Sequence, residues 1–432
     1  MVGTMDKFQL EPQTAARPLL HAMAKKSIRQ VLHEWRTLVE QKQLGALDRG
    51  QFSLLLRFIR PKIQYPQSHV RGIEYMRAIA LLNDIFSVKA QMEELRMPLL
   101  PHDWHHVLLM AAQCHQMHRV EWVWDEMSTL QVPKNVRMWN AYMLGKMNGL
   151  SAKGMMAEEN EGNTRAADAA LQVLERIRAD GAQPDYHSMA LCLFAQAKAG
   201  RMGEVDRIIK ETWNIPHDES RPLCDPTSRF YPTHSTLLHM VNAYGINGEI
   251  EKMVVVLETA TRVYNLPPIP RDVSDALLRW TIFAAKSKRV AQTAPMELCK
   301  ILQAKPYRVR PSILMLAMQT SYLVAIRDIN GAKDCLNRMC LLYPWEKVQR
   351  QVEKVVNQIL EGLLQTQRYS DAVYFANKWK DRVELNMRKV ERARKRIAEG
   401  RTPDRSVVPL GRGVRPVEHQ EELPVLPVLN PL

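Results

Sequence analysis

The chain echoes itself at a fixed interval of 35 residues. Trp104 and Trp139 have this spacing, and so do the pairs Met92/Met127, Leu95/Leu130 and Pro98/Pro133. A period between about 20 and 50 residues is typical of solenoids, in which each short unit buries its apolar face only against its neighbours. We therefore expect a repeat protein whose function lies along an extended surface.

Each unit is predicted to be a helical hairpin. In residues 101–135, apolar residues recur at helical spacing in two successive runs: Trp104, Val107, Leu108 and Ala111, then Val120, Val123, Trp124 and Met127. Pro133 and Asn135 then favour a turn, because proline disfavours helix at the preceding residue and asparagine tolerates turn geometry. The pattern predicts an all-α fold, an α-solenoid superhelix of stacked helix-turn-helix repeats.

The later units vary in length. The unit from Val136 to Asp185 has a surplus of 15 residues, which we assign to a surface loop at 150–164 between its two helices because of its Gly, Asn and Glu content. Two further hairpins follow, at 186–213 and 234–264, separated by an irregular stretch at 217–232. Weaker helix pairs are expected at 52–59 with 73–95, 311–325 with 332–339, and 356–364 with 372–379, giving seven or eight hairpins in all.

We expect four regions along the chain. Residues 1–50 form an N-terminal helical or targeting region, in which the basic segment 15–35 is either part of a mitochondrial targeting signal or the first solenoid helix. The solenoid covers 51–379 and is clearest at 101–268. A basic helix follows at 380–400, part of a continuous helix from 378 with an apolar stripe of Val383, Met387, Val390 and Ile397. The proline-bearing tail at 401–432 is predicted to be disordered.

The charge favours a polyanionic partner. The formal net charge is +14 and the isoelectric point is near 9.5, so nucleic acid is the first expectation and an anionic membrane surface the second. A third explanation is residence among other basic proteins. The longest apolar stretch, at 313–326, is too short to span a bilayer. Six cysteines without a CxxC pattern indicate neither a disulfide framework nor a zinc site, which favours a reducing compartment.

The chain carries no signature of catalysis. The motifs GxxxxGK[ST], GxGxxG, HExxH and GxSxG do not occur in it. Five histidines cluster between 102 and 118, but no carboxylate or cysteine completes a convincing ligand set for a metal ion. We expect no enzyme activity, no cofactor and no bound metal.

Two stretches resemble the pentatricopeptide repeat family, whose units are 35-residue helical hairpins with Gly at the inter-helix turn and Pro-Asp at the end. They are Pro184 to Val205, PDYHSMALCLFAQAKAGRMGEV, and Thr164 to Asp185, TRAADAALQVLERIRADGAQPD. The tetratricopeptide repeat is the nearest competitor, but its 34-residue spacing fits the cleanest stretch less well. The resemblance implies binding of single-stranded RNA.

In that family, one base is read per repeat by the side chains at the fifth and last positions. The clearest unit offers Asn140 and Asp185, which resemble the uridine-preferring combination, and the preceding unit offers His105 and Asn135. The next two units place Ala190 and Leu238 at the fifth position, and the second of them ends on Pro268. Those two units are expected to read nothing, so sequence specificity should be weak.

Two other groups of residues have alternative interpretations. Arg388, Lys389, Arg392, Lys395 and Arg396 are expected either to contact RNA or to be hydrated while the stripe packs on the last hairpin. Trp104, Trp122, Trp124 and Trp139 lie on hairpin helices, and we expect them to be buried rather than to stack on bases.

The resemblance therefore implies a non-catalytic, single-stranded RNA-binding protein of the mitochondrial matrix, similar to fungal members of the family. Its expected partners are a mitochondrial transcript or ribosomal RNA, and it would act in RNA processing, stability or translation, with association with the mitochondrial ribosome as an option. The alternative is a helical-repeat scaffold or assembly factor for a mitochondrial complex, without base-specific recognition. The two nonreading units favour that alternative.

Overall fold

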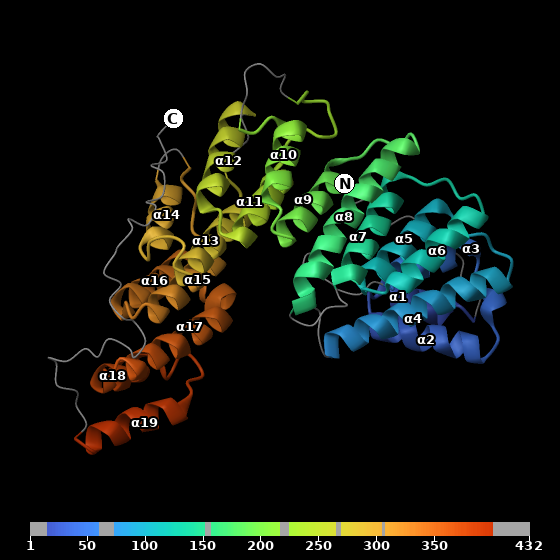
Figure 1. Cartoon of the computed structure of the whole chain (residues 1–432). Helices are drawn as coiled ribbons and strands as arrows, with labels where there is room; N and C mark the ends of the chain where they lie inside the picture. The colour runs from blue at the N-terminus through green and yellow to red at the C-terminus, as the bar shows by residue number, and fades with distance from the viewer. Residues whose placement is uncertain are drawn as a thin grey trace. The chain divides into compact units, whose positions relative to one another are not determined.

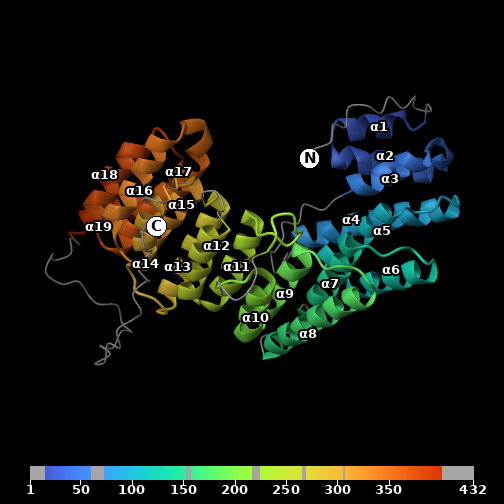
Figure 2. The same ribbon diagram turned by 90° about the horizontal axis from the view of Figure 1, so that it is seen from above.

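The computed structural model describes residues 15–59, 73–151, 157–216, 224–264, 269–304 and 307–400. Within these ranges the chain forms helices joined by turns, with no strand. It divides into two compact units, residues 1–201 and 202–432, and the helices of each unit lie side by side in chain order (Figures 1 and 2). Among the described residues, every helix falls short of the length or apolarity that a bilayer crossing requires.

The first unit contains nine α-helices and a short 3-10 turn, η1, within its described residues. Their bounds are α1 (Arg17–Ala24), α2 (Ile28–Glu40), η1 (Leu44–Ala46), α3 (Arg49–Phe58), α4 (Ile73–Glu94), α5 (Pro101–Gln113), α6 (Met117–Thr129), α7 (Val136–Ser151), α8 (Ala157–Ala179) and α9 (Tyr186–Lys198).

The second unit continues the same alternation of helices. Its described helices are α10 (Met202–Trp213), α11 (His234–Asn247), α12 (Ile250–Val263), α13 (Arg271–Lys286), α14 (Ala294–Gln303), α15 (Ile313–Ala325), α16 (Ile329–Leu342), α17 (Trp345–Gln365), α18 (Tyr369–Trp379) and α19 (Met387–Ala398). The predicted all-α solenoid is confirmed.

Side chains before the first helices set where these helices begin. Asp48, Asp185 and Thr233 each accept a hydrogen bond from a backbone N–H in the first turn of the helix that follows, which satisfies a donor with no partner inside the helix. At the ends of α9 and α11, Gly200 and Gly248 have φ near +70°, a conformation that lets the chain reverse at little steric cost. Local contacts thus define where these helices begin and end.

The first helices of successive hairpins pack directly on one another. We call α3, α5, α7 and α9 the first-helix row of the first unit, and α11, α13, α15 and α17 that of the second; neighbours within each row are in contact. The second helices of neighbouring hairpins contact one another far less. Each hairpin therefore stacks mainly through its first helix, which makes the first-helix row the continuous face of each unit.

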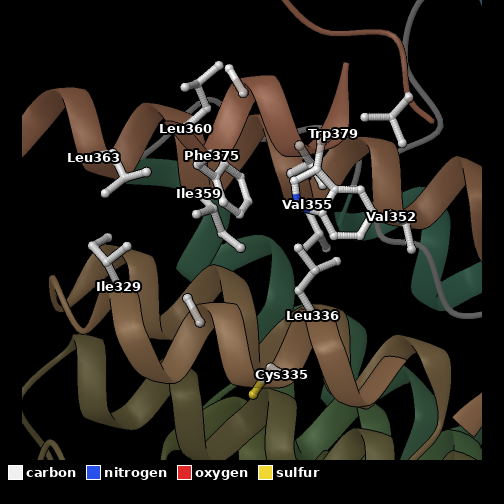
Figure 3. Close-up of a cluster of buried hydrophobic side chains, with 14 of the residues drawn as sticks. Ile329, Cys335, Leu336, Val352, Val355, Ile359, Leu360, Leu363, Phe375 and Trp379 are labelled. Atoms are coloured by element: carbon white, nitrogen blue, oxygen red, sulfur yellow. The ribbon is translucent and has the colours of Figure 1, made fainter. Parts of the chain in front are cut away.

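The core of the second unit shows how hairpins stack. Leu336 from α16, Ile359 from α17 and Trp379 from α18 belong to one cluster of buried apolar side chains (Figure 3). The cluster continues into Val390 and Ala393 of α19. Full burial of a large apolar side chain stabilises a fold by about 1.5–3 kcal/mol. α19 thus covers the apolar end of the stack, as a terminal cap in a solenoid must.

Two expected elements were wrong. Residues 157–164, assigned to an inserted loop, are helical. They form the first part of α8, a long helix that packs along α7. The continuous helix expected from 378 to 400 is broken at 380–386, since Val383 turns inward to the core and Asn386 N–H donates to Asn357 at 3.0 Å. Tertiary packing overrides the local pattern in both places.

Trp122 also departs from expectation. Trp104, Trp124 and Trp139 are buried as predicted, but Trp122 is 49% exposed. Its ring lies beside that of Phe86 and above the ammonium of Lys89, with centroid distances of 5.5 and 4.8 Å. The indole therefore covers a buried cation at the surface of α6 instead of entering the core.

The expectations for the two ends of the chain fall partly outside the described residues. In the segment 15–35, α1 and α2 are separate helices, and Leu19, Val31 and Trp35 are buried. This part packs as folded structure, whereas residues 1–14 and the tail at 401–432 lie outside the described ranges.

Candidate nucleic-acid interface

The structure brings together Asn140 and Asp185, which are 45 residues apart. Asn140 is the fifth residue of α7 and Asp185 immediately precedes α9, the next helix of the row. The Nδ2 of Asn140 donates to Oδ1 of Asp185 at 2.9 Å. Asn140 and Asp185 lie together because the hairpins stack. Stacking places the start of α9 beside the first turns of α7.

Ser188 completes this small network. Its hydroxyl donates to Oδ1 of Asn140 at 2.7 Å, and its backbone N–H donates to Asp185 at 2.9 Å as part of the cap of α9. An asparagine amide has two N–H donors and accepts through two lone pairs. Asn140 therefore retains one N–H and one lone pair, in an orientation fixed by two neighbours.

Flat, exposed side chains flank this network. Arg137 lies one helical turn before Asn140 on α7, and His187 is the second residue of α9. The His187 ring stacks on that of Tyr186, with centroids 4.2 Å apart. Guanidinium and aromatic planes are the groups on which unpaired bases stack. Sequence reasoning missed both residues, although each stands second in its helix.

The preceding unit is arranged differently. His105 is half-buried on α5, and burial, together with the nearby Arg137 guanidinium, lowers the pKa of His105. Its imidazole is therefore neutral at pH 7, with one donor and one acceptor nitrogen. Asn135 is exposed and accepts from the backbone N–H of Met138 at 3.1 Å, at the start of α7. His105 and Asn135 thus occupy the same positions in their helices as Asn140 and Asp185. They do not form the same network of hydrogen bonds among the described residues.

The same register recurs at a position that sequence reasoning missed. Asp275, the fifth residue of α13, accepts from the hydroxyl of Ser312, which precedes α15, at 2.7 Å. Asp275 is buried, and that burial raises the pKa of its carboxyl group. Counting five residues from the start of α13 would have found it, but the start was not recognised because no hairpin was assigned to 271–303.

A serine, a histidine and an aspartate meet between α3 and α5 without forming a catalytic triad. The hydroxyl of Ser53 contacts Nε2 of His102 at 2.9 Å and also donates to Asp103. The same Nε2 faces Asp103 at 3.2 Å, whereas a triad needs the carboxylate on the other ring nitrogen. Asp103 is buried and caps α5, so the group fixes the contact between two first helices.

The cations of the last helix face outward. On α19, Arg388, Arg392, Lys395 and Arg396 are exposed, while Val390 and Ala393 are buried against the last hairpin. Lys389 forms an ion pair with Glu361 of α17. Packing of the stripe and exposure of the cations therefore coexist. Met387 and Ile397, expected in the stripe, remain partly exposed.

Exposed cations without an ion pair in the described residues gather around this cap. They lie on the end of α18, the following turn and α19: Lys378, Lys380, Arg382, Arg388, Arg392 and Arg394. The first-helix row of the second unit is mixed by comparison, with Asp272 and Asp275 beside Arg279 and Lys286 on α13. The cap therefore carries a denser cluster of exposed cations than α13 does.

Comparison with known proteins gives one family match and one curated relative. Residues 187–294 match the model of a family described as mitochondrial ATPase expression. The pentatricopeptide repeat-containing protein 6, mitochondrial, of the fission yeast Schizosaccharomyces pombe is 22% identical over 299 residues, which is 64% of this chain and 66% of that protein.

The solved structures that match share the fold. The crystal structure of the pentatricopeptide repeat protein PPR10 from maize superposes with a TM-score of 0.54 at 12% identity, covering 89% of this chain and 56% of that one. The structure of PPR10 in complex with an 18-nt psaJ RNA element has a TM-score of 0.50 at 13% identity, covering 90% of this chain and 56% of that one. The chain thus spans just over half of that chain and under two thirds of the yeast relative.

The architecture of the chain and the comparisons point to the same kind of repeat: helical hairpins that stack through their first helices. The 35-residue echo from Met92 to Trp139 has the length of the family's unit, and the fold is that of its solved members. The chain therefore has the helical-repeat fold of a solved pentatricopeptide repeat protein and is similar in sequence to a mitochondrial protein that contains such repeats.

Proposed function

We propose that the chain binds single-stranded RNA without catalysis, along the first-helix row, and acts in mitochondrial gene expression. The observation that carries this proposal is the network of Asn140, Asp185 and Ser188, which holds an amide in one orientation with one donor and one acceptor free. Such an amide matches the edge of a uracil, which offers an N–H beside a carbonyl oxygen. Asp185 and Ser188 would position it.

Stacking and phosphate contacts would supply most of the affinity. Arg137 and His187 stand on either side of the network in the chain, where they would hold a base by its faces at about 1–3 kcal/mol per stacked base. The cations of α19, including Arg388, Lys389, Arg392, Lys395 and Arg396, would attract the backbone irrespective of sequence. His105 and Asn135 would add a second, weaker base contact.

The proposed compartment is the mitochondrial matrix. The yeast relative is named as mitochondrial, and the matched family is described by mitochondrial ATPase expression. We propose that the target is a mitochondrial transcript, with one encoding an ATPase subunit as the first candidate. Stability, processing and translation of that transcript are the processes in which such binding would act, and ribosomal RNA is the second candidate target.

Fluorescence anisotropy with labelled RNA tests the base contact. Asn140→Ala should weaken binding to a uridine-containing oligonucleotide about tenfold, since a paired contact to a base edge contributes about 1–3 kcal/mol. The same substitution should change the affinity for an oligonucleotide with adenosine in place of uridine only a little. Asp185→Ala should act in the same direction, because it frees the amide to rotate.

Asp185→Ala also removes a helix cap, so it needs a matched control. Thr233→Ala removes the equivalent cap of α11, whose fifth residue is Leu238 and offers no hydrogen bond to a base. Each substitution should cost about 1 kcal/mol of stability, but only Asp185→Ala should weaken RNA binding. Equal RNA affinities for these two variants and the wild type would remove the base contact from the proposal.

A protein-binding scaffold is the second candidate function. The second unit favours it, because its first-helix row exposes apolar side chains, with Phe283 on α13 46% exposed and Leu314 on α15 47% exposed. Failure of the wild type to bind any single-stranded RNA at low salt would select this candidate.

A further inference from the structure

A groove opens between α6 and α8 in the first unit, with α7 as its floor. Its volume is about 400 Å³, and Met117, Tyr142, Lys146, Arg165, Val173 and Arg176 are among its lining residues. Tyr142 and Lys146 follow Asn140 by two and six residues, which places them about 200° and 240° around α7 from it. The groove therefore faces away from the proposed RNA-reading surface.

Glycines of α7 let α6 pack closely against α7 beside this groove. A Cβ atom on Gly149 would lie 2.4 Å from Cβ of Met117, and one on Gly145 would lie 2.7 Å from a methyl carbon of Val120. Only glycine lets α6 approach α7 this closely. Since α6 and α8 make little contact with one another, the space between these two second helices stays open.

The groove has the length of a short helix. Its α8 wall runs from Arg165 to Arg176, a distance of about 16 Å, or three helical turns. Ala169 and Val173 lie between these two arginines on the same face, opposite Met117. An apolar strip with a cation at either end is the complement of an amphipathic helix that carries acidic residues beside its apolar face.

The charge of the groove is positive after its internal pairs are considered. Asp168 is paired with Arg201 at 2.5 Å, and Lys146 with Glu121 at 2.6 Å. Arg165 is held loosely by Glu161 at 3.8 Å, and Arg176 has no ion pair among the described residues. Two exposed guanidinium groups thus remain for an acidic ligand.

Tyr142 makes RNA a poor fit for the groove. Its ring stacks on Trp124, with centroids 4.2 Å apart, and it is only 5% exposed. No open aromatic face is therefore offered to a base. An apolar floor with a few fixed cations suits a polypeptide better.

We propose that this groove binds an acidic amphipathic helix of a partner protein. The apolar residues of that helix would rest on Met117 and Ala169, and its carboxylates would pair with Arg165 and Arg176. The site is independent of RNA binding, so a partner and a transcript would occupy opposite sides of α7 at the same time.

Labelled helical peptides of about 15 residues, long enough to cover three turns, test the proposal with the full-length chain. One peptide combines leucine on one face with glutamate beside it, and its match carries lysine for each glutamate. The wild type should bind the acidic peptide and not the basic one. Arg165→Glu with Arg176→Glu should weaken the acidic peptide about tenfold and gain binding of the basic peptide.

Arg96→Glu with Arg178→Glu is the matched control, since both residues are exposed and lie outside the groove lining. This control should leave peptide binding unchanged, and both double variants should bind RNA like the wild type. Wild-type affinity that is absent, or equal for the two peptides, would overturn the proposal. A drop in RNA affinity on reversing Arg165 and Arg176 would instead make the groove a phosphate site.

Discussion

At the scale of single residues, Lys89 is the most unusual group of the first unit. Its side chain is 1% exposed, and its ammonium pairs with Glu93 and with Glu126, the latter at 2.8 Å. The rings of Trp104 and Trp122 lie 5.1 and 4.8 Å from it. A buried cation is tolerated only when charge and hydrogen bonds compensate its desolvation, and here α4 supplies the cation while α5 and α6 supply partners.

Removal of this cation should be costly. Lys89→Ala should lower the free energy of unfolding by about 3 kcal/mol, because it leaves Glu126 half-buried without its partner. Lys89→Met with Glu126→Gln should recover part of this stability, since it removes the charges of Lys89 and Glu126 and keeps the volume, while Glu93 is 42% exposed and can be hydrated. Urea unfolding measures both variants. A change under about 1 kcal/mol for Lys89→Ala, as expected for the exposed pair of Arg165 and Glu161, would mean that solvent reaches the site.

At the scale of helices, close approach between neighbours in the first-helix row depends on small residues. On α11, Gly245 receives the indole of Trp280 from α13, and Trp280 Nε1–H donates to Asn242 at 2.9 Å. A Cβ atom on Gly245 would lie 2.1 Å from Cγ of Trp280. The interface that joins these two hairpins therefore has no room for a methyl group.

Gly245→Ala should destabilise the chain by about 1–3 kcal/mol, because the added methyl group would displace the indole of Trp280. Gly203→Ala is the matched control in the same unit, since no atom lies within 4 Å of the added Cβ. That change should be neutral or stabilising by up to about 1 kcal/mol, because alanine favours helix. Thermal unfolding followed by circular dichroism separates the two, and equal melting temperatures would contradict the packing described for α11 and α13.

The last helix allows a test of the phosphate contribution. Replacing Arg388, Arg392, Lys395 and Arg396 by glutamine should flatten the dependence of log affinity on log salt by about 0.7 for each phosphate that these cations neutralise in the wild type. Base preference should stay as it is in the wild type. If the salt dependence of the affinity equals that of the wild type, these cations are hydrated and do not contact RNA phosphates.

At the scale of the whole molecule, the sequence predicted the fold well because its signals are local. The 35-residue echo sets the unit length, and a capping residue such as Asp185 marks where a first helix begins. The pairing of Asn140 with Asp185 then follows from stacking alone. The loop prediction failed at 157–164, because α8 packs along α7 and is longer than its composition favours, whereas residues 152–156 of the predicted loop lie outside the described ranges.

Other features had no local signal. Asp275 and Ser312 meet only because α13 stacks on α15, and the start of α13 carries no side-chain cap that would mark it. Arg137 and His187 flank the amide network because each is second in its helix, a register that becomes visible once the helix starts are known. The groove beside Met117 depends on the gap between α6 and α8, which no sequence pattern records.

Ultraviolet crosslinking of the chain to a uridine-containing single-stranded RNA, followed by mass spectrometry of the modified peptides, tests whether the first-helix row contacts the bases. We expect nucleotide adducts on peptides from α7 and α9, with Arg137, Asn140 and His187 in or beside them, and further adducts on α19. Adducts confined to second helices such as α6 and α8, or none at low salt, would contradict this expectation.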